Sequence, residues 1–279
     1  FSDSDEDYPD PLATKQVRTK AKKSRFPVRT DLNDRISLWL GDPTELGVDA
    51  LVNPTPITST DRKGLGGRIL EAGGKELETQ LRSLERARTG EVRPTPGFKL
   101  ATSTILHTVG PRYSPQYITA AENALHSCYR SAIDYCVENK LKTLAIPPVH
   151  SLHRHYPTVD GAHIAIRTIR RLLEYRPAAL DRIVLVFDTS DAENVDVYYS
   201  LMRLYFPRNM EEQTFAMDKL PTDTGNEFGE TVVEERKVRI NAAFMPGRIG
   251  GFSSPASATA SSSRRFVDDE DEEDEEEDE

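Results

Sequence analysis

The 279-residue sequence has little cysteine, a single tryptophan and no long apolar run. Its two cysteines, Cys128 and Cys136, lie within an apolar helical pattern. We interpret them as core residues of a protein from a reducing compartment, rather than as a disulfide or a metal site. No segment approaches the ~18–20 apolar residues of a membrane helix, and no charged-then-apolar leader is visible. We therefore expect an intracellular protein, cytoplasmic or nuclear, with no membrane span.

Apolar residues make up only 37% of the chain, below the usual ~45–50%, so part of the chain is not expected to pack. Residues 1–25 open acidic and turn basic, which predicts a disordered arm. Residues 211–279 are predicted to form a low-complexity tail that ends in the 12 carboxylates of Asp268–Glu279; without them the formal charge of −10 becomes +2. Apolar periodicity between these segments predicts one domain over residues 26–210.

Within this domain, strand and helix patterns alternate, which predicts an α/β fold with a largely parallel sheet covered on both faces. One helical pattern runs through Ile164–Leu173, and its periodicity predicts that Arg167, Arg170 and Arg171 face water. The expected strands are 36–40, 49–53, 104–109, 143–146 and 182–187, and the other expected helices are 120–140 and 195–205.

Ligands of such sheets bind beyond the carboxyl ends of the strands. The segments expected there carry recognisable motifs. They are Gly41-Asp42, Asp49-Ala-Leu-Val-Asn53, Gly64-Leu-Gly-Gly67, Ala72-Gly73-Gly74, Gly90-Glu91, Ile105-Leu-His-Thr-Val-Gly-Pro111, Pro147–Pro157 and Phe187-Asp188. As a string, these motifs resemble those of macro domains of the Appr-1''-p processing type. The resemblance implies a three-layer α/β/α sandwich that binds ADP-ribose.

The resemblance also implies roles for individual residues. Asp42 would accept a hydrogen bond from the adenine amino group, but the next residue is Pro43, which lacks the N–H that usually contacts the ring. Asn53 would orient the distal ribose. The aspartate that activates water in hydrolytic members falls at Gly66, and their second asparagine at Pro56. The alternative for Asp42-Pro43 is a plain turn.

Two segments are candidates for binding the diphosphate. Gly64, Gly66 and Gly67 precede or open a helical pattern, where backbone N–H groups bind phosphate, although a simple turn is the alternative. In Pro147–Pro157, Leu152 and His155 replace two family glycines, and side chains would have to hold the anion instead. The remaining alternative is a solvated loop. The other candidate ligand-binding residues are His150, Ser151, Arg154, Tyr156 and Phe187.

No metal is expected, because His150, His153 and His155 match no zinc spacing. His107 lies within a strand and is interpreted as a structural histidine with its hydrogen bonds satisfied. No cofactor is expected either.

Three functions are compatible with these residues. The first is a non-catalytic module that binds ADP-ribose or a related nucleotide, or acts as a scaffold, through a degenerate cleft. The second is an ADP-ribosyl hydrolase in which Asn53 positions the ribose and His150 or a substrate-assisted water does the chemistry; Asp61 is a further residue that could substitute for the missing carboxylate. The third is a purely structural interaction domain. In addition, the seven cations of Lys15–Arg29 predict weak contact with nucleic acid, for which the acidic run would compete.

Overall fold

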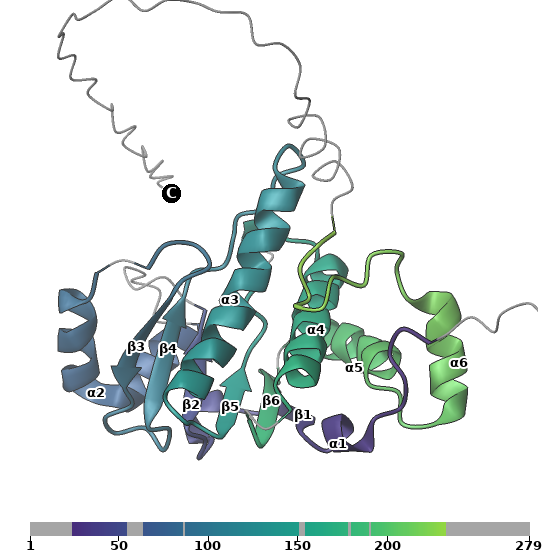
Figure 1. The fold of residues 1–279 in the computed structure, drawn as a ribbon. Coiled ribbons are helices and arrows are strands. Elements are labelled where there is room, and N and C mark those ends of the chain that lie inside the picture. The colour runs from purple at the N-terminus through teal and green to yellow at the C-terminus, as the bar shows by residue number, and fades with distance from the viewer. Residues whose placement is uncertain are drawn as a thin grey trace, which may run out of the picture. The chain divides into compact units, whose positions relative to one another are not determined.

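The computed structural model describes residues 24–54, 64–85, 87–150, 154–177, 180–189 and 191–232. The predicted strands and long helices are present, with ends shifted by a few residues (Figure 1). The elements are α1 (Thr30–Asn33), β1 (Ile36–Leu40), η1 (a 3-10 turn, Pro43–Glu45), β2 (Ala50–Asn53), α2 (Leu65–Ser83), β3 (Val92–Pro96), β4 (Thr104–Thr108), α3 (Ile118–Glu138), β5 (Thr143–Ile146), α4 (Thr158–Tyr175), β6 (Arg182–Phe187), α5 (Ala192–Tyr205) and α6 (Met210–Lys219).

The strands form one six-stranded sheet in the order β1-β6-β5-β2-β4-β3. All neighbours pair in parallel except β3, which is antiparallel to β4. The sequence did not predict β3, because its Pro94 and Pro96 are poor strand residues. An edge position tolerates them, since one side of an edge strand needs no N–H donors.

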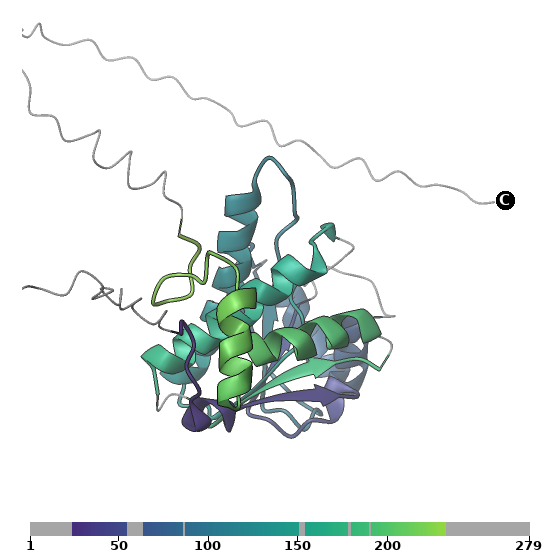
Figure 2. The same cartoon turned by 90° about the vertical axis from the view of Figure 1, so that its right-hand side faces the viewer.

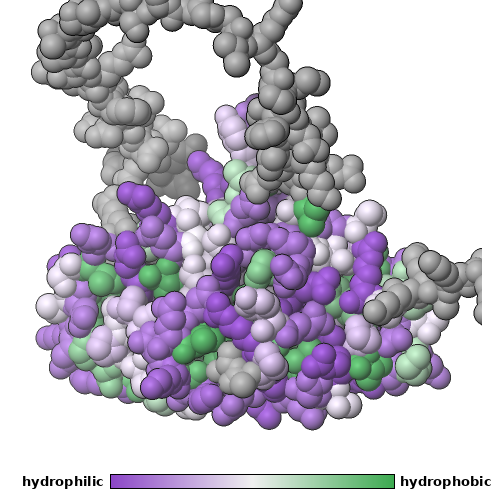
Figure 3. Space-filling model, viewed as in Figure 1, coloured by the Kyte–Doolittle hydropathy of each residue, from purple (hydrophilic) through white to green (hydrophobic). Residues whose placement is uncertain are grey.

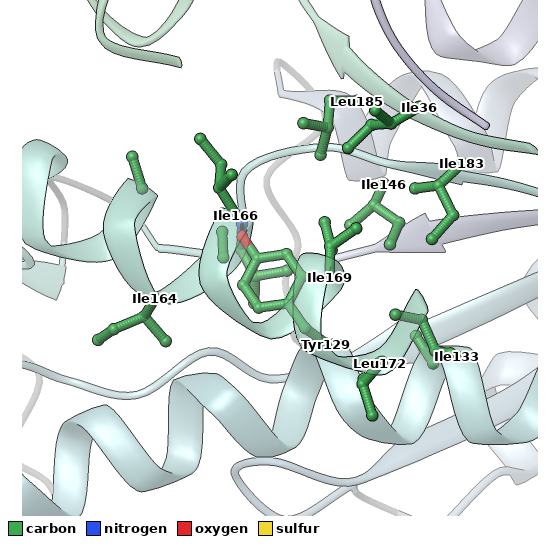
Figure 4. Close-up of a cluster of buried hydrophobic side chains, with 14 of the residues drawn as sticks. Ile36, Tyr129, Ile133, Ile146, Ile164, Ile166, Ile169, Leu172, Ile183 and Leu185 are labelled. Carbon is green, nitrogen blue, oxygen red and sulfur yellow. Dashed lines mark hydrogen bonds between the residues drawn. The ribbon is translucent and has the colours of Figure 1, made fainter. Parts of the chain in front are cut away.

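Alternating side chains of the buried strands supply two hydrophobic cores. On one face, Leu51, Ala145 and Val186 pack with α2. On the other, the neighbouring strand residues pack with α3, α4 and α5, and Figure 4 shows Tyr129 and Ile169 in this cluster. Helices therefore cover both faces of a largely parallel sheet, as expected of the three-layer sandwich.

The prediction that the arginines of α4 face water is wrong for two of them. Arg170 is fully buried and Arg167 is 5% exposed; only Arg171 stays partly exposed. The Arg170 guanidinium donates to the carbonyls of Tyr205 and Pro27 at 3.0 and 3.1 Å, and to Glu174 at 2.8 Å. Helical periodicity did not reveal this, because the partners come from segments distant in sequence.

The packed part of the chain also runs past the boundary expected at residue 210. Helix α6 packs against α5 (Figure 2), and the segment that follows it reaches Val232. Within that segment, the Phe228 carbonyl accepts a hydrogen bond from His126 Nε2 at 2.9 Å, and Thr231 Oγ1 accepts one from Arg167 at 3.0 Å. Long-range contacts of this kind leave no periodic signal in a polar segment.

Two cations of the basic arm lie within the described residues, and one of them, Arg25, takes part in this packing. Arg25 donates to the carbonyls of Pro221 and Thr222, and Arg29 pairs with Asp31 at 2.6 Å. The other five cations of the arm, and the acidic run, lie outside the described residues. The face in Figure 3 is mostly hydrophilic, with small scattered hydrophobic areas. None of the helices in the described part of the chain has the length and apolarity needed to cross a membrane.

We expect Arg170→Ala to lower the free energy of unfolding by about 3 kcal/mol. The change leaves two backbone carbonyls without a donor and Glu174 without its buried partner. The control is Arg82→Ala in α2, whose side chain is 78% exposed and whose loss should cost under about 0.5 kcal/mol. Urea unfolding measures both, and equal losses would contradict the assignment of Arg170 as a core residue.

Candidate functional site

The parallel pairing brings the carboxyl ends of β1, β6, β5, β2 and β4 to one edge of the sheet, called here the carboxyl edge. Asp42 follows β1, Asp188 follows β6, and Asn53 ends β2. His150 and Arg154 lie in the segment between β5 and α4. The polar residues predicted after the strands are thus gathered in the order in which the strands lie in the sheet, rather than in sequence order.

At one end of this edge, Arg68 of α2 lies between two carboxylates. Its Nη2 is 2.6 Å from Asp188 Oδ2, and its Nε is 3.6 Å from Asp42 Oδ2. The other oxygen of Asp42 accepts hydrogen bonds from the backbone N–H and hydroxyl of Thr44, at 3.0 and 2.9 Å. Asp42 caps η1, with Pro43 as its first residue, so a local turn and a charged cluster are both present.

Farther along the edge, three side chains form a buried hydrogen-bond chain. Asn53 Nδ2 donates to His107 Nδ1 at 3.2 Å, and His107 Nε2 contacts Thr95 Oγ1 at 2.9 Å. Since an amide nitrogen only donates, the His107 proton belongs on Nε2. Burial lowers the pKa of His107 to about 4, which keeps the ring neutral. The interpretation of His107 as a satisfied structural histidine is confirmed, and the ring also fixes the orientation of the Asn53 amide.

His150, Tyr156 and Phe187, which are predicted ligand-binding residues, are buried like Asn53. His150 is 4% exposed and stacks on Tyr198, while its Nε2 lies 3.2 Å from Asn194 Oδ1. Burial lowers the pKa of His150 to about 4. Tyr156 is fully buried, and burial raises its pKa. Phe187 is 2% exposed and packs edge-on against Tyr198. Their contact with a ligand stays a prediction.

The segment before α4 keeps a backbone conformation that suits glycine. His155 is exposed and has φ of +56°, a left-handed conformation that is uncommon for residues other than glycine. Beside it, Arg154 donates to the Gly110 carbonyl at 3.1 Å, and its own carbonyl accepts from Tyr113 N at 2.9 Å. Ser151 lies outside the described residues, as does Leu152.

The glycines before α2 define the start of that helix. Gly64 is its N-cap, and Gly66 and Gly67 are buried in its first turn. The N–H groups of a first helical turn have no partner within the helix, so this terminus can bind an anion. Arg68 belongs to the same turn, and its backbone N–H donates to the Gly64 carbonyl at 3.2 Å.

Analysis of the sequence missed Arg68 and Thr95 as members of the site. Arg68 directly follows the glycine motif, so its place in the first turn of the helix after β2 was a usable signal. Thr95 had no signal, because β3 itself was not predicted.

A pocket of about 440 Å³ lies away from the carboxyl edge, between β1, α5 and α6, and includes Leu38, Tyr199 and Arg208 in its lining.

The family follows from comparison with known proteins. The sequence model of the Macro domain matches residues 52–165. The crystal structure of the macro domain of ganglioside-induced differentiation-associated protein 2 (GDAP2) is 37% identical, with a TM-score of 0.63, and the match covers 67% of this chain and 92% of that one. The chain belongs to the macro domain family, which confirms the predicted resemblance and sandwich fold.

Among curated proteins, the chain is similar to the GDAP2 homolog of Nematostella vectensis, at 43% identity over 218 residues, which are 78% of this chain and 43% of that protein. The Xenopus tropicalis GDAP2 is 42% identical over the same shares of the two chains. The chain thus spans less than half the length of these relatives. A Trypanosoma brucei macrodomain solved in complex with ADP-ribose is 27% identical, with a TM-score of 0.54 and coverage of 60% of this chain and 69% of that one.

We expect the stability of the protein to fall as the pH drops from 7 to 5, partly through His107. The pKa of this ring is 6.5 in the unfolded chain and about 4 in the folded one, so the unfolded state binds more protons in this range. The contribution of His107 is fully present above pH 6.5 and decreases by about 2 kcal/mol at pH 5.

Urea unfolding of the wild type and His107→Gln at both pH values isolates this contribution, because His150 titrates in both proteins. The variant should lose about 2 kcal/mol less than the wild type between pH 7 and 5. The same pH dependence in the two proteins would contradict a neutral, buried His107.

Proposed function

We propose that this chain is a macro module that binds ADP-ribose or a related nucleotide weakly and does not hydrolyse it. The observation that carries the proposal is the buried, oriented amide of Asn53 at the carboxyl edge. It lies on the same edge as Asp42 and the α2 N-terminus, in a chain 27% identical to a macrodomain solved with ADP-ribose. In this proposal, Asp42 contacts the base, the N-terminus of α2 and Arg154 contact the diphosphate, and Asn53 contacts the distal ribose.

The carboxylates of the carboxyl edge support the absence of hydrolysis. Position 66 is glycine, and the two aspartates that follow β1 and β6 are both paired with Arg68. A general base must be positioned to take a proton from the attacking water, and these two carboxylates are instead directed to Arg68. His150 is the other described candidate base, but it is 4% exposed and its Nε2 contacts Asn194. Asp61 lies outside the described residues.

We expect titration calorimetry to detect weak ADP-ribose binding, with an affinity that falls by about fivefold or more in Asn53→Ala, because an unmade hydrogen bond to a buried polar group costs about 1–3 kcal/mol. The control is Asn139→Ala at the exposed end of α3, and thermal unfolding checks that both variants fold. If the affinity for ADP-ribose is unchanged in Asn53→Ala, the proposed contact between Asn53 and the ribose is wrong.

The same titration distinguishes two interpretations of the segment between β5 and α4. Either the segment has lost its contacts with the diphosphate, or it holds the diphosphate with side chains. Leu152→Gly with His155→Gly, combined with Pro43→Ile, should tighten binding, since glycine at position 155 relieves the left-handed strain and residue 43 regains an N–H. If the triple variant binds no better and Arg154→Ala abolishes binding, Arg154 holds the anion instead.

We expect no release of ADP-ribose from a mono-ADP-ribosylated protein above the rate without the module. A positioned general base contributes about 10²–10⁴ in rate, and no unpaired carboxylate occupies that role among the described residues of the carboxyl edge. Chromatography of released ADP-ribose over several hours is the measurement. Efficient release that disappears in Asn53→Ala would favour the hydrolase instead.

A further inference from the structure

The segment of residues 221–232 follows α6 and runs back over α3 and α4 (Figure 1). Two of its glycines, Gly225 and Gly229, have positive φ and lie against α4. The Phe228 carbonyl accepts a hydrogen bond from His126 of α3 at 2.9 Å. The segment is thus attached to the domain through residues that play no part in the proposed function.

Thr231 lies near the end of this segment, against a buried arginine of α4. The side chain of Arg167 is 6% exposed, and its Nη2 donates to Thr231 Oγ1 at 3.0 Å. Its other terminal nitrogen, Nη1, makes only a long contact of 3.4 Å with Asp223 Oδ2. Arg167 Nε is shielded from solvent and has no hydrogen-bond partner within the described part of the chain. The guanidinium therefore has one short contact, with a neutral hydroxyl, and one unused donor.

A phosphate group on Thr231 would supply the missing acceptor. Nε and Nη2 lie on one side of the planar guanidinium, and two such donors bind two oxygens of one phosphate. Since Nη2 already contacts the oxygen that would carry the phosphate, the added oxygens lie close to the unused Nε. The nearby carboxylates have partners of their own. Asp223 Oδ1 accepts from Gly225 N at 2.8 Å, and Glu230 Oε1 lies 3.3 Å from Arg130 Nη1.

The sequence around Thr231 fits the enzymes that would add this group. The stretch Glu230-Thr-Val-Val-Glu-Glu235 places a carboxylate three residues after the threonine, which is the spacing of an acid-directed kinase site. Thr231 is partly exposed and Val232 is exposed, so local opening at the end of the segment gives a kinase access to the hydroxyl. We propose that Thr231 is a phosphorylation site and that Arg167 binds the phosphate, which strengthens the attachment of residues 221–232 to α4.

The chemistry is a phosphoryl transfer from ATP, catalysed by the kinase. Thr231 Oγ1 attacks the γ-phosphorus and forms a new P–O bond, while the bond from that phosphorus to the β,γ-bridging oxygen breaks. ADP leaves, and the kinase takes the hydroxyl proton. The product carries a charge of about −1.5 to −2 at pH 7 and three acceptor oxygens. Its contact with Arg167 is charge-assisted, roughly twice as strong as the neutral contact that it replaces.

Incubation of the full chain with casein kinase 2 and ATP tests the modification, with the sites mapped by mass spectrometry. Ser2 and Ser4 also have a carboxylate three residues later and are the positive control for the kinase. Thr222, which has Gly225 at that place, is the negative control. We expect phosphate on Thr231. If Ser2 and Ser4 are modified and Thr231 is not, the proposal is overturned.

Hydrogen exchange then measures the attachment of the segment, in a Ser2→Ala, Ser4→Ala background that leaves Thr231 as the modified site. Amides of residues 225–231 should exchange about tenfold more slowly after phosphorylation, because a hydrogen bond to a charged group contributes more than a neutral one. Arg167→Lys keeps the charge but not the paired donors, so it should still be phosphorylated and lose most of this slowing. Thermal unfolding verifies that the variant folds. Equal or faster exchange after phosphorylation contradicts binding of the phosphate by Arg167.

A second measurement needs no substitution at Arg167. In phosphorus NMR, the phosphate on Thr231 should titrate at a lower pH in the folded chain than in the urea-unfolded chain, because a bound guanidinium stabilises the dianion. The same titration in both states would sink the proposed contact. Neither measurement involves a nucleotide, so their failure leaves the proposed function standing.

Discussion

Parallel strand pairing is the constraint on which the rest of this molecule depends. Five neighbouring strands run in one direction, so every residue that follows one of them comes to the same edge of the sheet. Parallel sheets bury both faces, which leaves that edge as the place where polar side chains can meet. Asp188 is distant in sequence from Asp42 and Asn53, and the pairing of β6 with β1 and β5 brings it to the same edge.

The fold was largely predictable because its signals are local. Five of the six strands carry apolar runs ended by turn residues, and α3 and α4 carry helical periodicity. What the sequence did not predict depends on contacts between distant segments. Arg170 is buried because the carbonyls of Pro27 and Tyr205 reach it, and no pattern along α4 reveals those partners. Burial of Arg170 in turn holds the segment before β1 against the end of α5.

The location of the candidate site could be predicted from the sequence, but the directions of its side chains could not. Topology placed Asp42, Asn53 and the glycines of α2 on the carboxyl edge, as the strand order required. The direction of a side chain is a different matter, since His150 and Phe187 follow or end strands and yet pack inward against Tyr198. Arg68 contacts the aspartates that follow β1 and β6 because the crossover from β2 to α2 places the first turn of α2 beside them. The glycine motif marks that turn but does not identify the partners of Arg68.

The departures from the family pattern at the end of β1 are physically connected. Pro43 removes a donor, and Arg68 supplies one a short distance away while neutralising the two aspartates on either side. Arg68 is held at 2.6 Å by Asp188 and lies beside Asp42, which is an ordered arrangement because two anions alone at this edge would repel each other. This end of the site is therefore an ordered cluster of charges, whereas the segment before α4 holds His155 in a left-handed conformation better suited to glycine.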